Sequence, residues 1–281
     1  MNVGDLYIYA QNIFLQAKKQ NYANDIKILI SYALKIDNPE KLPLLKAQTI
    51  TSNQFAECKK IIQRRLHNEP VAYIVGTKPF WKHDFFVNES VLIPRPETEL
   101  IIETALTKID VHKKIKILDL GTGSGCLAVS LKYEFVNSEI ICTDISKSAL
   151  IVAQRNIENL HQKDIKLYLG NWFSPLKKSD KFDLIVSNPP YININDWAKL
   201  DYNVANFEPK GALTDYSNGL THYQHIITNA QNHLAKNGIL LLEIGFNQQK
   251  DISAILTNNH FKFKVHLDLN RIPRTIEAII K

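Results

Sequence analysis

The chain has 281 residues, of which 45% are hydrophobic and 22% are charged. This length fits one large domain or two unequal ones, and the composition excludes a disordered chain and a fibrous repeat. No apolar run reaches the roughly 18 residues that a membrane span needs. The first residues, MNVGDLYIYAQN, lack the basic start and apolar stretch of an export signal. We therefore expect a cytoplasmic protein that does not associate with a membrane.

Basic residues exceed acidic residues mainly in the first quarter of the chain. In total, 34 basic and 28 acidic residues give a formal net charge of +6 at pH 7, and residues 1–70 hold ten of the former and six of the latter. A small basic surface can attract an acidic partner such as RNA or an acidic protein. We interpret pairs such as Lys18-Lys19 and Arg64-Arg65 as parts of solvent-exposed helix faces rather than as a binding surface. We expect no direct binding of DNA.

The cysteine and histidine residues form neither a disulfide pattern nor a metal-ligand pattern. Cys58, Cys126 and Cys142 are too few and too scattered for either pattern, which is typical of a protein from a reducing compartment. The nine histidines show no ligand spacing beside a carboxylate. His222 and His225 are three residues apart, and we expect both on the exterior of a helix. The sequence therefore predicts no metal site.

Residues 1–70 show the helical spacing of apolar residues and are expected to form a small helical bundle. Asn24 can cap a helix in which apolar residues recur at steps of three and four, namely Ile26, Leu29, Ile30 and Leu34. Thr51 and Gln54 have the spacing of a capping box ahead of a further apolar series.

The period changes to two between residues 71 and 93. This stretch is rich in aromatic and β-branched residues, as in AYIVG, FWKHDFFV and VLI. Such alternation is typical of half-buried strands. We therefore expect residues 71–93 to form a β-hairpin linker.

Strand and helix patterns alternate over residues 94–281. Strands are expected at Lys116–Asp119, Ile140–Thr143, Ile165–Leu169, Phe182–Ser187, Ile239–Glu243, Phe263–Leu267 and Thr275–Ile280. Helices are expected at Leu127–Tyr133, Ala149–Leu160, Gly219–Leu234 and Gln248–Leu256. This alternation predicts an α/β domain with a largely parallel sheet. The last two strands are too close in sequence for a helix between them and should pair antiparallel.

A glycine-rich loop follows the first of these strands. The segment IKILDLGTGSGCLAVSL has, between a buried strand and a helix, the residues Gly121, Thr122, Gly123, Ser124 and Gly125. Glycine allows a sharp turn and lets a ligand approach backbone N–H groups at the start of a helix. Asp144 ends the next strand, where a carboxylate can hold both hydroxyls of a ribose.

Two classes of cofactor bind at loops of this kind. A dinucleotide fingerprint has the spacing G-x-G-x-x-G, whereas here the spacing is G-x-G-x-G and Cys126 follows. The spacing found here is associated with S-adenosylmethionine, which carries no pyrophosphate for a helix dipole to stabilise. The position of Asp144 argues against a merely structural turn. We therefore favour S-adenosylmethionine over NAD.

A second loop, in the segment FDLIVSNPPY, follows the fourth predicted strand. Pro189 and Pro190 each fix φ near about −65° and lack a backbone donor, and Asn188, which precedes a proline, is biased toward an extended conformation. The loop then offers two acceptors, the side-chain carbonyl of Asn188 and the backbone carbonyl of Pro189. Because both loops follow parallel strands, they are expected on the same rim of the sheet.

Two such acceptors, without a strong acid or base, suit a planar –NH₂ group of a carboxamide or of adenine. The nitrogen of such a group is a poor nucleophile because its lone pair is delocalised, so holding it in line with a sulfonium methyl supplies proximity and orientation. The same two oxygens stabilise the positive charge that develops on the nitrogen. The ring of Tyr191 can stack on the flat group. The thioether that leaves is neutral, so no metal is needed.

Segments along essentially the whole chain resemble the release factor glutamine methyltransferases of the PrmC/HemK group. Besides the two loops, they are NEPVAYIVG, FWKHDFFV, VLIPRPETE, CTDIS, GNWF, FEPKGAL and LLLEIGFNQ. The elements IPRPETE and FEP…AL separate this group from other enzymes with NPPY more sharply than NPPY does. The resemblance implies a Rossmann-like methyltransferase domain with a mostly parallel seven-stranded sheet, and a small all-helical N-terminal domain joined to it by a β-hairpin.

The resemblance further implies an activity and a partner. The reaction would be methylation of the side-chain amide nitrogen N5 of glutamine in the Gly-Gly-Gln motif of class 1 peptide chain release factors, with S-adenosylmethionine as the donor. Residues 1–70 would recognise the protein substrate, and a monomer is expected.

The resemblance also carries roles onto individual residues. The cofactor site would include residues 121–125, Asp144 and Trp172, with Trp172 near the adenine. Asn188 would contact both cofactor and substrate. The glutamine amide would be held by Asn188, Pro189, Pro190 and Tyr191, of which Asn188, Pro189 and Tyr191 are the candidate catalytic residues.

Other residues of the family motifs are expected near the site in supporting roles. They can serve as salt-bridged scaffold at least as readily as they can contact a ligand. They are Arg95, Glu97 and Thr98 in IPRPETE, and Glu208 in FEP. One departure from the family pattern is Asn171, which stands where an aspartate often precedes the tryptophan. Asn171 can still accept from an adenine amine but lacks the charge.

Two further hypotheses fit part of the pattern. The Asn188–Tyr191 loop would present the same acceptors to the adenine amine of DNA or RNA, although such enzymes usually carry a large basic recognition region, and residues 192–218 are few and nearly neutral. A noncatalytic module that binds S-adenosylmethionine would need the glycine loop but not the amide clamp, by which we mean the two acceptor oxygens of Asn188 and Pro189. We therefore favour the methylation of a protein amide.

Overall fold

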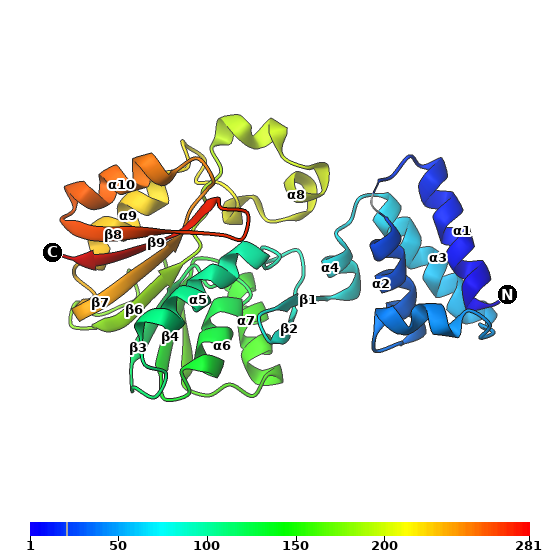
Figure 1. The fold of residues 1–281 in the computed structure, drawn as a ribbon, viewed down its shortest axis with the longest axis horizontal. Helices are drawn as coiled ribbons and strands as arrows, with labels where there is room; N and C mark the ends of the chain where they lie inside the picture. Colours follow the sequence, from blue (N-terminus) through cyan, green and yellow to red (C-terminus); the bar gives the residue numbers. More distant parts are fainter. Residues whose placement is uncertain (21) are drawn as a thin grey trace. The chain divides into compact units, whose positions relative to one another are not determined.

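The computed structural model describes residues 1–20 and 22–281. The chain divides into two compact units (Figure 1). The first comprises residues 1–77 and 201–207, and the second comprises residues 78–200 and 208–281. The boundaries at residues 70 and 93 remain predictions. Within the described part of the chain, no helix has the length and hydropathy of a membrane span.

The first unit is helical. Its elements are α1 (Val3–Gln16), α2 (Ala23–Leu34), the 3₁₀ segment η1 (Pro39–Leu45), α3 (Ser52–Leu66), α4 (Val71–Val75) and α8 (Tyr202–Phe207). The capping box of Thr51 and Gln54 is confirmed at the start of α3. The prediction that Asn24 caps α2 is wrong: the helix begins earlier, because the Tyr22 carbonyl already accepts from the Ile26 N–H, and Asn24 lies inside the first turn.

The predicted strand pattern is also wrong for residues 71–75, which form α4. Pro70 precedes this helix, where its missing N–H costs no hydrogen bond, and Gly76 ends it with φ +75°. Ile74 packs with Leu29 and Ile61, so the apolar run is buried by helix packing rather than by a sheet. A two-stranded sheet does follow, formed by β1 (Thr77–Phe80) and β2 (His83–Phe86).

The second unit contains a seven-stranded sheet with the order β5-β4-β3-β6-β7-β9-β8. Its strands are β3 (Lys116–Leu120), β4 (Glu139–Asp144), β5 (Ile165–Leu169), β6 (Phe182–Ser187), β7 (Leu234–Glu243), β8 (Phe261–Leu267) and β9 (Pro273–Ile280). β9 runs antiparallel to both of its neighbours, and the other pairs are parallel. The predicted Rossmann-like, mostly parallel sheet is therefore confirmed, as is the antiparallel final pair.

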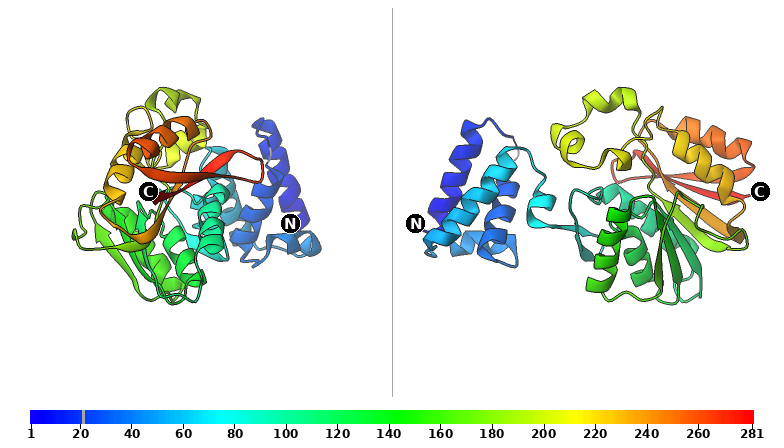
Figure 2. Two further views of the ribbon diagram at one scale, coloured as in Figure 1. Left: turned by 60° about the vertical axis from the view of Figure 1, so that its left-hand side comes forward. Right: turned by 180° about the vertical axis from the view of Figure 1, so that it is seen from behind.

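Helices cover both faces of this sheet, as Figure 1 and the views in Figure 2 show. α5 (Glu99–Lys108), α6 (Cys126–Glu134) and α7 (Lys147–Asn159) lie on one face, and α9 (Thr221–Ala230) and α10 (Gln249–Asn258) lie on the other. Neighbouring residues of a strand point to opposite faces. In β6, Leu184 and Val186 accordingly pack in the cluster with α5–α7, whereas Ile185 packs in the cluster with α9 and α10.

The predicted helices differ from the observed ones by one or two residues at most of their ends, and by four residues at one end. The helix expected over Gly219–Leu234 ends at Ala230, and Leu234 already begins β7. Leu234 pairs with Phe182, whose N–H donates to the His233 carbonyl, so this apolar residue extends the sheet. The helical period alone does not distinguish these two fates of a buried leucine.

The strand register brings four chain segments together at the carboxyl edge of the sheet. Leu120 of β3 is level with Thr143 of β4 and with Ser187 of β6, and Ser187 is level with Leu242 of β7. The next residue of each of the four segments therefore lies in one row, which consists of Asp144, Gly121, Asn188 and Glu243. The strand order departs from sequence order between β3 and β6, which is where ligands bind in open α/β sheets.

Candidate functional site

A cavity of about 440 Å³ lies at this carboxyl edge within the second unit. Of the residues predicted to bind the cofactor, it is lined by Gly121, Thr122, Gly123, Ser124, Asp144, Trp172 and Asn188. Gly125 does not line it. From the second loop, Pro190 lines the cavity, whereas Pro189 and Tyr191 do not. The structure thus gathers most of the predicted residues at one cavity, and their roles remain predictions.

The glycine loop combines a tight turn with an open approach. Gly123 has φ +55°, and a side chain at this position would meet no atom within 4 Å. The absence of a side chain therefore leaves space in which a ligand can approach the backbone. Gly125 has φ +79°, and a Cβ there would lie 3.2 Å from the Ala153 side chain of α7. Gly125 serves the close packing of the loop against α7, which explains why it does not line the cavity.

Asp144 joins the end of β4 to the glycine loop. One of its carboxylate oxygens accepts from the Gly123 N–H at 2.9 Å, and the other accepts from the Ser146 N–H at 2.8 Å. Burial raises the pKa of Asp144, while these N–H groups act in the opposite direction. A carboxylate oxygen has more than one acceptor site, so both oxygens can also accept from a pair of ribose hydroxyls.

Trp172 and Asn171 form another part of the cavity wall. The indole of Trp172 is 9% exposed and contacts the ring of His222 edge-on, with ring centroids 5.1 Å apart. A flat, mostly buried aromatic surface of this kind suits the packing of a nucleobase. Asn171 supplies an amide, without charge, beside it.

The prediction that His222 lies on a helix exterior is wrong. His225 is exposed, but His222 is half-buried and lines the cavity. Burial lowers the pKa of His222, which favours the neutral ring. A sequence signal existed, because His222 stands four residues before the buried Ile226 and hence at the border of the apolar face of α9.

Sequence reasoning also missed Asp119, the residue before last in β3, two positions before the glycine loop. It is 1% exposed, and one carboxylate oxygen accepts from the Thr122 hydroxyl at 2.6 Å. The other oxygen has no hydrogen-bond partner among the residues that the structure describes. Burial, with a smaller contribution from the negative charge of Asp144, raises the pKa of Asp119 to about 7.

The side-chain amide of Asn188 is oriented by a neighbouring threonine. Its Nδ2 donates to the Thr98 hydroxyl oxygen at 3.1 Å. Among residues 1–20 and 22–281, no group donates to Asn188 Oδ1 or to the Pro189 carbonyl. Asn188 lines the cavity, so its carbonyl oxygen is available to a ligand. Pro189 is buried and does not line the cavity, so a role of its carbonyl remains a prediction.

Tyr191 connects the second loop to the hydrophobic core of the second unit. Its ring packs against the hydrophobic cluster beneath α9 and α10, and its hydroxyl is 3.5 Å from Glu243 Oε1. Its carbonyl accepts from Gln248 Nε2 at 3.0 Å. These contacts hold the loop against the sheet, and a role of Tyr191 in stacking remains a prediction.

The motif residues in predicted supporting roles fall into two groups. Arg95 and Thr98 line the cavity, whereas Glu97 and Glu208 do not. Arg95 pairs with Glu208, whose second carboxylate oxygen accepts from the Ile93 N–H at 3.1 Å. Glu208 is almost fully buried, so it acts as scaffold that ties residues 93–95 to the segment after Phe207.

The cavity fits S-adenosylmethionine by the chemistry of its walls. It offers an open glycine backbone, a carboxylate for ribose hydroxyls and an aromatic surface for adenine, at Gly123, Asp144 and Trp172 respectively. For the described part of the chain, no three His, Cys, Asp or Glu side chains are grouped as metal ligands.

Comparison with known proteins assigns the family. Residues 5–76 match the model of the PrmC N-terminal domain, and residues 97–206 match that of the methyltransferase small domain. The chain is 39% identical to a release factor glutamine methyltransferase of Salmonella typhimurium, over 75% of this chain and 76% of that protein. For the Clostridium acetobutylicum protein of the same name, identity is 32% over 99% of both chains. The chain belongs to the release factor glutamine methyltransferase family.

Other matches show only a shared fold, or cover only part of a longer protein. The crystal structure of a methyltransferase from Pyrococcus furiosus is 17% identical and covers 77% of this chain and 95% of its own, with a TM-score of 0.54. The chain also spans about half the length of the bifunctional methyltransferases of Rickettsia that it matches, for example 36% identity over 50% of the Rickettsia bellii protein.

We expect Asp119 to make the stability of the second unit depend on pH. Its pKa is near 3.8 when unfolded and about 7 when folded, so its contribution to stability is fully present below pH 3.8 and is lost as the pH rises to about 7. In Asp119→Asn this loss cannot occur. The thermal midpoint should therefore fall less between pH 5 and pH 8 in the variant than in the unsubstituted protein.

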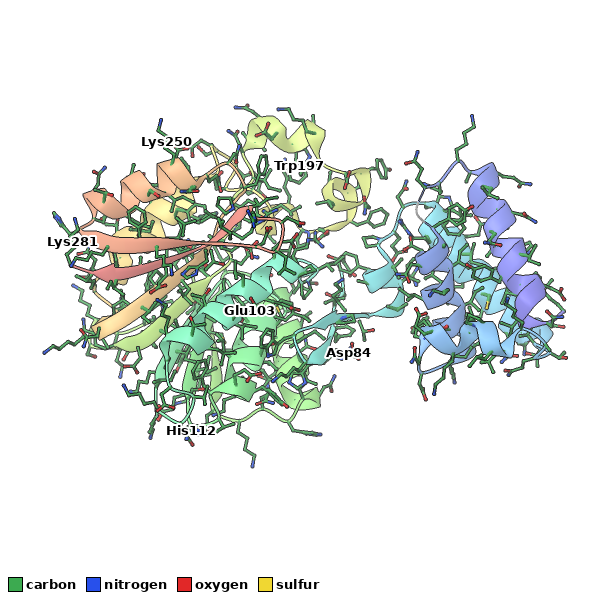
Figure 3. All side chains as sticks on the ribbon, viewed as in Figure 1. Asp84, Glu103, His112, Trp197, Lys250 and Lys281 are labelled. Atoms are coloured by element: carbon green, nitrogen blue, oxygen red, sulfur yellow. The ribbon has the colours of Figure 1, made fainter. Side chains whose placement is uncertain are left out.

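Tryptophan fluorescence can follow this transition, because Trp81, Trp172 and Trp197 all lie in the second unit. Asp84→Asn is the matched control, since Asp84 is exposed on β2 and is labelled in Figure 3. It should leave the pH dependence unchanged. An Asp119→Asn protein with the same pH dependence as the control would contradict the expected titration.

We expect Asp144→Ala to weaken the binding of S-adenosylmethionine by roughly 10- to 100-fold, the cost of losing hydrogen bonds to a charged group. Isothermal titration calorimetry of the pure protein measures this directly. Asp84→Ala should bind as tightly as the unsubstituted protein. Equal affinity of the Asp144 variant would show that the ribose is held elsewhere.

Proposed function

We propose that the chain transfers a methyl group from S-adenosylmethionine to the side-chain amide nitrogen of a glutamine. The observation that carries this proposal is the orientation of Asn188. Its amide N–H group is engaged by Thr98, its carbonyl oxygen is free, and it lines the same cavity as the glycine loop. An acceptor beside a cofactor pocket suits a substrate that is itself an N–H donor.

The proposed mechanism uses position and charge rather than a strong base. Bound S-adenosylmethionine supplies an electrophilic methyl group on a sulfonium. The carbonyls of Asn188 and Pro189 each accept one N–H of the substrate amide, which fixes its nitrogen relative to the pocket. As positive charge develops on that nitrogen, both hydrogen bonds strengthen, so these oxygens bind the transition state more tightly than the substrate. The proton that is lost can pass to water.

We further propose that the glutamine belongs to the Gly-Gly-Gln motif of class 1 release factors. Two relatives that the chain matches over most of their length are named release factor glutamine methyltransferases. In this proposal residues 1–70 recognise the protein substrate, residues 71–93 form the linker, and residues 94–281 hold the chemistry. The protein would act as a monomer in the cytoplasm, where release factors work, without a metal and without binding DNA.

The test is methyl transfer by Asn188→Ala. The variant should lose methyl transfer to a purified release factor by at least about 100-fold, the scale for losing one preorganised transition-state contact. Its affinity for S-adenosylmethionine, measured by calorimetry, should be only partly weakened. Asn258→Ala is the control, because Asn258 is exposed at the end of α10 and should keep full activity.

Mass spectrometry of the product identifies the modified residue. A methyl group on the glutamine of Gly-Gly-Gln supports the proposal. Labelled methyl incorporated into nucleic acid but not into the release factor would favour the adenine-amine alternative. Binding of the donor with no transfer to any acceptor would favour a noncatalytic module.

A further inference from the structure

Glu243 is a buried carboxylate at the ligand edge of the sheet with no role in the mechanism so far. It ends β7, and it is 1% exposed. Because Ser187 of β6 is level with Leu242 of β7, the next residues along the two segments, Asn188 and Glu243, lie side by side. A buried charge of this kind must be stabilised by its neighbours, so its partners indicate its function.

The two oxygens of Glu243 meet the hydroxyls of Thr98 and Tyr191. Oε2 accepts a hydrogen bond from the Thr98 hydroxyl, and Oε1 is 3.5 Å from the Tyr191 hydroxyl. Thr98 comes from the turn before α5, and Tyr191 comes from the loop after β6. Glu243 therefore contacts that loop directly through Tyr191 and indirectly, through Thr98, at Asn188.

The Thr98 hydroxyl passes this orientation on to Asn188. A hydroxyl has one hydrogen to donate, and here the Thr98 hydroxyl donates it in a hydrogen bond to the Glu243 carboxylate. The lone pairs of Thr98 Oγ1 are then left to accept from Asn188 Nδ2. An asparagine amide has nearly the same shape after a half-turn, so its hydrogen-bond partners decide which end faces the cavity. With Nδ2 bound inward, Oδ1 is the end that remains for a ligand.

We propose that Glu243 is a positioning residue that, through the Thr98 hydroxyl, holds the Asn188 carbonyl toward the substrate amide. Without the carboxylate, the Thr98 hydroxyl can donate to Asn188 Oδ1 instead. The amide would then turn its N–H group to a substrate that also donates N–H. This inference rests on the proposed transfer to an amide nitrogen and names the group that sets the polarity of the clamp.

The charge state of Glu243 matters for this role. Burial raises its pKa to about 7, against the stabilising effects of the Thr98 hydroxyl and Arg274. The charged or titratable groups that face it from the elements around it are Arg274, Glu97, Tyr191, Tyr223 and Cys126. A protonated Glu243 can donate to Thr98, which reverses the hydrogen bond, so the clamp needs the carboxylate form.

The test is a double-mutant cycle on kcat with release factor as substrate. Thr98→Val and Glu243→Met each remove one link and should lower kcat by about 10- to 100-fold, the scale for misplacing a reacting group. Thr98→Ser keeps the hydroxyl and should stay within about 3-fold of the unsubstituted protein. Because Glu243 acts through Thr98, the double variant should be no slower than Thr98→Val alone.

The matched control for Thr98→Val is Thr275→Val. Thr275 is also fully buried and pairs with Glu243 across β7 and β9, but its hydroxyl has no hydrogen-bond partner within the described chain. It should keep the unsubstituted kcat. Donor affinity, measured by calorimetry, should stay within about 3-fold in every variant, which separates misorientation from loss of the fold.

Full kcat in Thr98→Val, or losses that multiply in the double variant, would overturn the inference. If Glu243→Met fails to bind the donor, Glu243→Gln replaces it: the unsubstituted kcat should rise with pH through about 7, and the Gln variant should lack this rise. A rise that persists in Glu243→Gln would also overturn the inference. If the unsubstituted protein methylates no release factor glutamine, the proposed function itself fails, independently of these variants.

Discussion

The site depends on the parallel register of four neighbouring strands. Leu120, Thr143, Ser187 and Leu242 are level across β3, β4, β6 and β7, so strand pairing by itself brings the next residue of each segment to one edge of the sheet. Asp144 and Gly121 form the cofactor half of this row, and Asn188 and Glu243 form the acceptor half. A change of register in the sheet would separate the two halves, so the buried alternating residues of the strands also protect the geometry of the site.

Two buried carboxylates lie at this edge of the sheet, Asp119 before the glycine loop and Glu243 within the row, and each accepts a hydrogen bond from a threonine hydroxyl. Thr122 donates to Asp119, and Thr98 donates to Glu243 beside the second loop. In both, burial raises the pKa to about 7. The ligand edge is thus electrostatically costly to fold, as expected where polar groups are preorganised for a ligand.

The sequence predicted those parts of the fold and of the site that depend on short stretches of neighbouring residues. Strand positions follow from apolar runs, and the glycine and NPPY loops follow from residues with restricted or unusual backbone conformations. It misassigned residues 71–75 and Leu234, because an apolar run can be buried by a helix or by a sheet. It also placed His222 outside, because the border of an apolar helix face depends on the neighbouring element.

The hydrogen-bond chain from Glu243 to Asn188 could not be predicted from local patterns. Its members come from the ends of β7 and β6 and from the turn before α5, and they meet only once the sheet is formed. IPRPETE and LLLEIG were recognisable as family motifs, but neither motif indicates which of its side chains contacts the other. Long-range pairing of polar side chains is specified by the tertiary structure.

The central claim is that Asn188 presents its carbonyl to an amide nitrogen, and a crystal structure of a ternary complex tests it most directly. The protein would be crystallised with S-adenosylhomocysteine and a peptide containing Gly-Gly-Gln. We expect the glutamine nitrogen within about 2.7–3.2 Å of both Asn188 Oδ1 and the Pro189 carbonyl. A glutamine bound through its carbonyl to Asn188 Nδ2, or outside the cavity, would contradict the claim.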